Sequence, residues 1–126
     1  MTTRATIRSI QDLMRQDPGV DGDAQRIAQL AWMLFLRTVD AQADDPAALH
    51  YPIPPGLRWR DWAHEHQELT GDALIAFVNE RLFPTLRTLG DEPPSPQAAL
   101  VRSVFSDTHN RMKSGTLLRQ VVNRID

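Results

Sequence analysis

The sequence contains no cysteine, so disulfides and thiolate metal sites are excluded. It also lacks a dominant charge, because 14 Lys and Arg stand against 16 Asp and Glu and the formal net charge is −2. That balance excludes a strongly basic nucleic-acid module and a disordered polyanion.

Long hydrophobic runs are missing as well. The longest uncharged apolar stretch, Ile27–Leu36, is about half of what a membrane span needs. The first residues, Met1 to Arg4, lack the apolar segment of a secretory signal. These features predict a cytoplasmic protein with no membrane partner.

Sequence motifs of common catalytic and nucleotide sites are not present. The six glycines never form a Gly-x-Gly pattern, and no Gly-x-Ser-x-Gly string occurs. A phosphate-binding glycine loop and a nucleophile elbow are therefore missing from the sequence. On these grounds no catalytic, cofactor-binding or metal-ligating residue is assigned.

Helical periodicity, in contrast, extends along most of the 126 residues. Apolar residues recur at helical spacing in five segments, and no internal repeat or convincing strand pair interrupts them. A chain of this length suits one domain. The pattern predicts an all-α fold, a compact bundle of about five helices, with residues 1–126 as a single domain.

Turn and cap signals set the expected boundaries of these helices. The helices are expected from the first residues to Asp17-Pro18-Gly19, from an N-cap at Asp23 to about Gln42, over 71–83 with a further turn at 85–89 beyond Pro84, from Ser95-Pro96 to about Met112, and from Ser114-Gly115 to the end. Residues 44–58 and 90–95 are expected loops, and the register of 58–68 stays open.

The run Leu30–Leu36 is apolar on every side of a helix for about two turns. A helix that is apolar all round is normally buried, so this segment is expected at the centre of the bundle with neighbours on several faces. On that basis Leu34→Ala would cost about 2–5 kcal/mol of stability.

Two clusters could be taken as metal sites. His64, Glu65, His66 and Glu68 are close in sequence, but on a helix the two histidines point about 200° apart, and structural zinc takes four protein ligands. Asp21 and Asp23 lie in a turn that lacks the closing Glu of an EF-hand. We favour a solvated polar segment for the first cluster, and cap and turn roles for the second.

Trp59 and Trp62 alternate with basic residues at Arg58 and Arg60. Exposed rings in that setting would suit stacking on nucleic-acid bases. The favoured alternative is that the rings cover a helical core while the arginine stems extend outward.

Arginines in two parts of the chain are candidate contacts to the DNA backbone. Arg4, Arg8 and Arg15 fall within about 40° of each other on a helical wheel, away from the apolar residues. Residues 102–126 carry a local charge of +3, although Arg111 and Lys113 are expected near a helix C-terminus, where the dipole alone favours cations. A plain solvated face is an equally good interpretation. The full candidate set is Arg4, Arg8, Arg15, Arg102, Arg119 and Arg124.

Seven strings occur in order along nearly the whole chain. They cover residues 10–15 (IQDLMR), 19–27 (GVDGDAQRI), 30–37 (LAWMLFLR), 74–79 (LIAFVN), 82–84 (LFP), 101–105 (VRSVF) and 112–122 (MKSGTLLRQVV). Together they resemble the helical N-terminal region of type I restriction–modification DNA methyltransferase (M) subunits.

The resemblance implies a larger enzyme than this chain. A full M subunit binds S-adenosylmethionine through a Gly-rich loop and holds a flipped adenine with an Asn-Pro-Pro-Phe/Tyr motif. Neither motif is present, and Asp91-Glu92-Pro93-Pro94 lacks both the leading Asn and the trailing aromatic ring. The catalytic methyltransferase domain is therefore expected to be absent, the chain inactive alone, and the sequence a fragment or short reading frame of an M subunit.

By resemblance, the domain is an interaction and clamp module of an adenine-specific DNA methyltransferase. The implied partners are its own catalytic domain, a second M subunit, the specificity subunit and, weakly, duplex DNA. The alternative is a stand-alone helical protein-interaction module with no DNA role, which the near-neutral charge favours and the ordered strings oppose.

We predict that the isolated chain does not bind S-adenosylmethionine, because no glycine-rich loop follows a strand in its sequence. Calorimetric titration of the chain with the methyl donor should give no binding heat. A stoichiometric micromolar complex would contradict this expectation.

Overall fold

The computed structural model describes residues 3–42, 52–64 and 69–126. Every regular element in these ranges is helical, which confirms the all-α prediction. The elements are α1 (Thr3–Met14), the 3-10 turn η1 (Pro18–Val20), α2 (Asp23–Gln42), α3 (Trp59–Trp62), α4 (Gly71–Ala76), the π-helical η2 (Phe77–Leu82), α5 (Phe83–Arg87), α6 (Pro96–Phe105) and α7 (Gly115–Ile125). None of these helices is long and apolar enough to cross a membrane.

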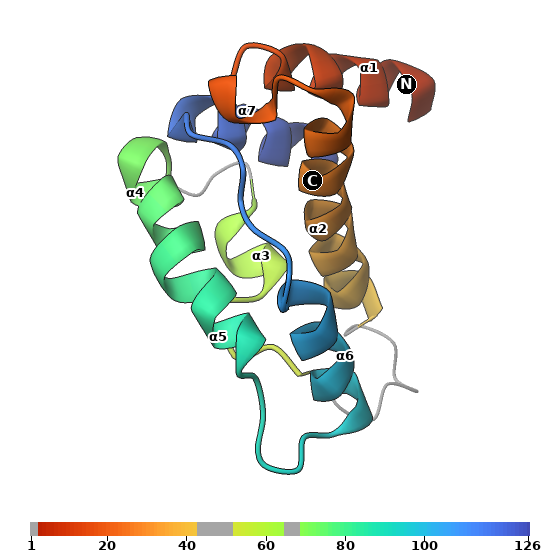
Figure 1. The fold of residues 1–126 in the computed structure, drawn as a ribbon, viewed down its shortest axis with the longest axis vertical. Helices are drawn as coiled ribbons and strands as arrows, with labels where there is room; N and C mark the ends of the chain where they lie inside the picture. Colours follow the sequence, from red (N-terminus) through yellow and green to blue (C-terminus); the bar gives the residue numbers. More distant parts are fainter. Residues whose placement is uncertain (1–2, 43–51, 65–68) are drawn as a thin grey trace.

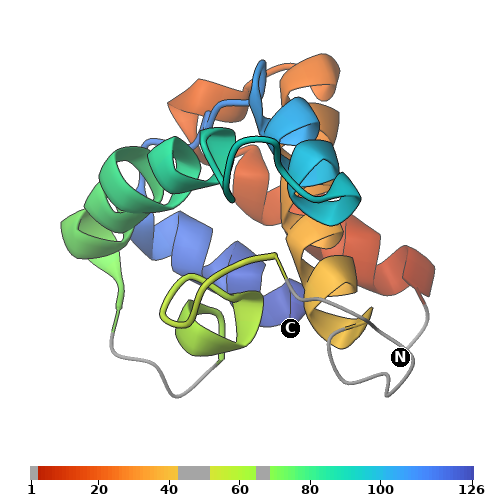
Figure 2. The same cartoon turned by 90° about the horizontal axis from the view of Figure 1, so that it is seen from below.

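The last helix, α7, organises the arrangement of the others. It lies beneath α1 and contacts α4 and α2, while α5 packs against α6 (Figure 1). Figure 2 shows α7 running between the arm formed by α4 to α5 and the long helix α2. The two ends of the chain therefore meet, since α1 crosses over α7.

The turn between α1 and α2 depends on Asp17. Its carboxylate is buried and accepts a hydrogen bond from the Gly19 amide at 2.8 Å, which caps η1 in front of Pro18. The same carboxylate accepts bonds from the amides of Lys113 and Ser114 at 2.8–3.1 Å. One side chain thus ties the first turn of the protein to the segment that leads into α7.

Pro84 does not end the helix in which it lies. Helical structure continues from Gly71 through Arg87, and the six residues before α5 form the π-helical turn η2. Proline has no N–H to donate and its ring displaces the preceding carbonyls, and a local i→i+5 turn accommodates both effects. Pro84 is therefore accommodated within a continuous run of helical residues by a local π-helical turn.

The helix expected to reach Met112 ends earlier, at Phe105, and the prediction of its length was wrong. Its start is confirmed, because the Ser95 hydroxyl accepts the Ala98 amide at 3.1 Å. Beyond it, the Arg87 guanidinium binds the carbonyls of Phe105 and Thr108 at 3.0 and 2.8 Å. These side-chain bonds replace the intrahelical ones, so the backbone leaves the helix without losing its partners.

As a consequence, Arg111 and Lys113 do not lie at a helix C-terminus as expected. They lie in the extended segment between α6 and α7, so their positive charges do not stabilise the C-terminal end of a helix dipole. The amide side chain of Gln29 holds this segment from α2: its oxygen accepts the Arg111 amide at 2.7 Å and its nitrogen donates to Asn110.

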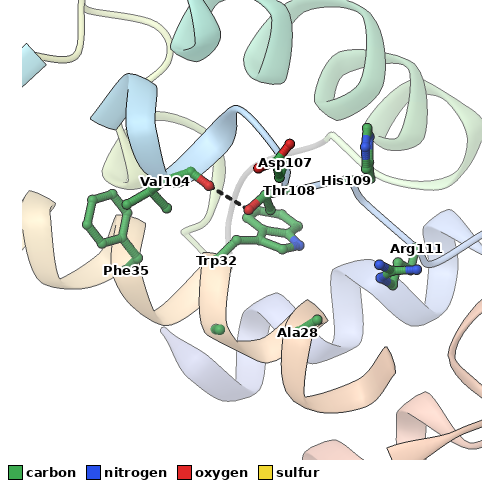
Figure 3. A pocket seen from close by; sticks show the side chains of 9 residues that line it. Ala28, Trp32, Phe35, Val104, Asp107, Thr108, His109 and Arg111 are labelled. Atoms are coloured by element: carbon green, nitrogen blue, oxygen red, sulfur yellow. Dashed lines mark hydrogen bonds between the residues drawn. The ribbon is translucent and has the colours of Figure 1, made fainter. Parts of the chain in front are cut away.

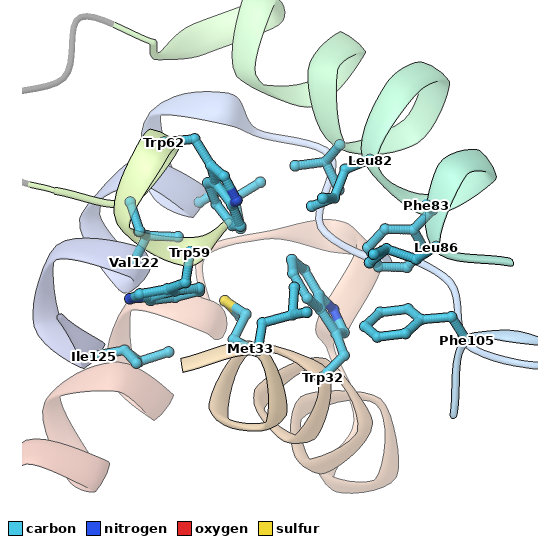
Figure 4. Close-up of a cluster of buried hydrophobic side chains, with 14 of the residues drawn as sticks. Trp32, Met33, Trp59, Trp62, Leu82, Phe83, Leu86, Phe105, Val122 and Ile125 are labelled. Atoms are coloured by element: carbon cyan, nitrogen blue, oxygen red, sulfur yellow. The ribbon is translucent and has the colours of Figure 1, made fainter. Parts of the chain in front are cut away.

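The core is built around aromatic rings from several helices (Figure 4). Trp32 packs edge-on against Phe83 at 4.9 Å between ring centroids, and Phe83 against Phe105 at 5.1 Å. Trp59 and Trp62 are 5.0 Å apart and each is 2% exposed. Because these rings are buried, the stacking platform for nucleic-acid bases is excluded and the core interpretation is confirmed.

The expectation that α2 is buried on every side was wrong. Trp32, Met33 and Leu36 are in the core, but Leu34 is 44% exposed and Ile27 is 65% exposed. The described residues cover only one side of this helix, because the other elements pack against α2 from that side alone.

We therefore expect Leu36→Ala to destabilise the domain by about 2–5 kcal/mol, since this side chain is fully buried and its loss leaves a cavity. Leu34→Ala, two residues earlier, should cost less than about 1 kcal/mol because the side chain already meets solvent. Thermal unfolding of the two variants checks the pair, and equal losses would contradict the placement of α2.

Candidate nucleic-acid interface

The six arginines predicted to meet DNA fall into two groups in the structure. Arg102 and Arg119 bind backbone carbonyls within the domain. The remaining four lie on α1, just after it, or on α7, where these two helices cross.

Arg119 is the most buried of the six candidate arginines. It projects from α7, is 7% exposed, and donates from Nη2 to the Trp62 carbonyl at 2.6 Å and from Nη1 to the Ala63 carbonyl at 3.1 Å. Its Nε donates to the Leu69 carbonyl at 2.9 Å. The guanidinium thus binds the end of α3 and the backbone two residues before α4, and it has no free face for a phosphate.

Burial affects the pKa of the Arg119 guanidinium. Desolvation lowers the pKa of Arg119 from its ordinary value, and the negative charge of Asp126 opposes the shift. The group stays protonated at neutral pH, because an arginine begins far above that range. Among the residues that the structure describes, its buried charge is matched by carbonyl dipoles and no carboxylate forms an ion pair with it.

Arg102 serves a similar purpose at the other end of the domain. From α6 it donates to the carbonyls of Leu89 and Gly90 and forms an ion pair with Glu92. These bonds hold the loop between α5 and α6 against the helix. Arg102 is therefore a structural arginine in the folded domain, like Arg119.

Arg4, Arg8 and Arg124 form what we call the α1–α7 basic edge. Arg124 donates from Nε to the Ser9 hydroxyl at 3.0 Å, which joins α7 to α1. Arg8 and Arg124 line one shallow depression, and Arg4 and Arg8 line the next one along α1. Residues from opposite ends of the chain thus form a continuous cationic surface.

Ion pairing leaves most of this charge unneutralised. In the described ranges, neither Arg4 nor Arg8 has an ion pair, and both are exposed. Arg15 is different, since it pairs with Asp12 at 3.3 Å on the exposed surface. Exposed cations without partners can contact phosphate oxygens at little desolvation cost.

Neither the cluster at residues 64–68 nor the pair Asp21 and Asp23 forms a metal site within the described part of the chain. No group of three or more His, Asp or Glu side chains converges there. Glu65, His66 and Glu68 lie outside the described residues, and His64 Nδ1 lies 3.2 Å from an oxygen of Asp126.

The methyl donor that the family implies does not fit these residues. S-adenosylmethionine is expected in a strand–glycine loop–helix unit, and the described residues contain no strand.

Sequence reasoning missed the polar side chains that connect distant segments. Asp17 and Gln29 are both buried, at 1% and 0% exposure, and each binds the segment before α7. A buried Asp or Gln gives no periodic signal, because its identity alone suits the surface equally well. Only the fold shows which amides lie beside it.

Comparison with protein families gives a match over almost the full length. The family model described as "HsdM N-terminal domain" covers residues 3–125. The chain is 47% identical over 131 aligned residues to the type I restriction enzyme EcoEI methylase subunit of Escherichia coli, with 100% of this chain aligned. It spans only 27% of the length of that relative.

Solved structures agree with this match. A modification subunit of a putative type I restriction enzyme from Vibrio vulnificus has a TM-score of 0.84 and 33% identity, over 97% of this chain and 29% of that subunit. A structure from work on complex assembly and conformational transition of the type I R-M system has a TM-score of 0.83 and 35% identity, over 97% of this chain and 25% of its own.

The fold and the alignments together define a helical domain of a DNA-modification system. The chain belongs to the HsdM N-terminal domain family, that of type I restriction–modification methylase subunits. The resemblance drawn from the sequence strings is thereby confirmed.

We expect Arg119→Gln to destabilise the domain by about 2–4 kcal/mol, because several buried carbonyls lose their donor together. Arg124→Gln makes the same chemical change on the same helix at an exposed position and should leave the melting temperature nearly unchanged. Thermal melts of the two variants test whether Arg119 is structural. Equal melting temperatures would return Arg119 to the candidate DNA contacts.

Proposed function

We propose that this domain is the interaction and clamp module of an adenine-specific type I DNA methylase subunit. In this role it contacts its own catalytic domain, a second M subunit and the specificity subunit, and its basic edge follows the DNA backbone. The methyl donor belongs to the catalytic domain, and the assembly works in the cytoplasm.

The observation that carries the DNA role is the α1–α7 basic edge. Arg4 and Arg8 are exposed and have no ion pair in the described ranges, and Arg124 extends their surface from α7. Three guanidinium groups on one side of a domain with net charge −2 create a local site rather than a general attraction. Contacts of this kind position a protein on DNA without reading its sequence.

The alternative, a protein-interaction module with no DNA role, is also supported by one observation. Much of the exposed side of α2 is apolar, with Ile27 and Leu34 among its residues, although Asp23 and Arg37 are exposed on the same helix. In a methylase subunit the two properties are compatible, since one surface can meet protein while another meets DNA.

The triple variant Arg4→Glu, Arg8→Glu and Arg124→Glu should weaken DNA binding by a methylase assembly that contains this domain, equally on target and non-target duplexes. The loss should come with a flatter salt dependence, the log–log slope falling by about 2–3, because up to three phosphate contacts disappear. Affinity measured over a salt series on both duplexes checks this.

A matched triple variant separates local from overall charge. Arg37→Glu, Arg81→Glu and Lys113→Glu change the net charge by the same amount at exposed positions on other elements. This control should keep the wild-type slope. If the two triple variants behave alike, or if only target binding falls in the first, the basic edge is not a backbone contact.

A further inference from the structure

The solvent side of α2 is apolar along its first three turns. Eight α2 residues share about 120° of arc on this side; Thr38 and Gln42 are polar, and the other six are apolar and uncharged. We call them the α2 outer face: Ala24, Ile27, Ala28, Ala31, Leu34 and Phe35. Ile27 and Leu34 are the most exposed of the large side chains, at 65% and 44%.

A groove borders this face where α2 meets the segment after α6 (Figure 3). Ala28, Ala31 and Phe35 form its wall on α2, and Val104 closes it from α6. The rest of its lining carries polar side-chain atoms, from Trp32, Asp107, Thr108, His109 and Arg111. Trp32 lines it from below, and Arg111 stands at one end, apart from Asp107 (Figure 3).

Trp32 brings a buried hydrogen-bond donor without an acceptor. The residue is 1% exposed, and its Nε1 has no partner within the described structure. Figure 3 shows the nitrogen-bearing edge of the ring turned toward the side of the groove where Arg111 stands. A buried N–H left without an acceptor costs about 1–3 kcal/mol, and this nitrogen is covered by the protein's own atoms although its ring lines the groove.

Arg111 adds a cation at the same place. Its backbone amide is bound by Gln29, but within the described residues its guanidinium has no hydrogen-bond or ion-pair partner. An occupant that suits this groove therefore has apolar side chains for the α2 wall and a carboxylate at the end where Arg111 and the Trp32 edge lie. An acidic group at that end would pair with the exposed Arg111 guanidinium.

We infer that the α2 outer face and its groove hold a helix of the remaining part of the methylase subunit, one with an apolar ridge and an acidic residue beside it. This rests on the proposed function, in which the domain works inside a larger subunit. The relatives are about four times as long as this chain. The chain matches 27% of the length of the EcoEI subunit. An uncharged apolar surface is typical of permanent interfaces rather than of transient partners.

Binding between separate chains tests the inference. The probe is the EcoEI methylase subunit without the segment that matches this chain, titrated into the isotope-labelled 126-residue protein. We expect association, with a change in the chemical shift of the Trp32 indole proton as the groove that its ring lines is covered. Trp32→Phe identifies this signal among those of the three tryptophans.

Two variants and a control locate the contact. Leu34→Asp should weaken the association by about tenfold or more, and Arg111→Gln by about fivefold, since they remove an apolar contact and the cation. Ile7→Asp, at a similarly exposed apolar residue on α1, should leave it unchanged. All three positions meet solvent, so the melting temperatures should stay near wild type.

Three results would overturn the inference. They are no association of the wild-type chain with the probe, equal loss in Leu34→Asp and Ile7→Asp, or self-association of the 126-residue chain that Leu34→Asp abolishes. The last would assign the face to a second copy. Failure of the DNA role is detected separately, because the basic-edge variants change salt-dependent DNA affinity while the α2 variants do not.

Discussion

The guanidinium of Arg119 is the interaction on which the arrangement of this domain depends. It projects from α7 toward the carbonyls at the end of α3 and at Leu69, two residues before α4, which otherwise would be buried without donors. Because α7 also carries α1 on its other side, this one contact fixes helices from the start, middle and end of the chain relative to one another. Asp17 and Gln29 act in the same way where the segment before α7 crosses η1 and α2.

This internal use of polar groups decides which surfaces are left for partners. Arg102 and Arg119 are bound within the domain, whereas Arg4, Arg8 and Arg124 face solvent where α1 crosses α7. Charge counted along the chain overstates the cationic surface for that reason. The apolar side of α2 lies on a different helix, so the contacts that we propose to DNA and to protein would not compete for the same residues.

Helix positions and core tryptophans were predictable from the sequence because periodicity and cap signals are local. The early end of α6 was not, because it depends on Arg87 reaching the carbonyls of residues 105 and 108 from another helix. The roles of Arg119 and Arg124 were also beyond local reasoning. Both are arginines on one amphipathic helix, and only the position of α3 makes one buried and the other exposed. The apolar run in α2 indicated burial correctly on one side only.

We propose that a methylase subunit covers the α2 outer face permanently and the basic edge only when DNA is bound. Hydroxyl-radical footprinting of the subunit, read by mass spectrometry, tests both parts at once, with Ile27 and Leu34 reporting on α2 and Ile7 on the depression it shares with Arg4 and Arg8. We expect Ile27 and Leu34 to be protected, relative to the isolated chain, with or without DNA, and Ile7 to become protected only when duplex is added. Ile27 and Leu34 as reactive as in the isolated chain, or Ile7 unaffected by DNA, would contradict it.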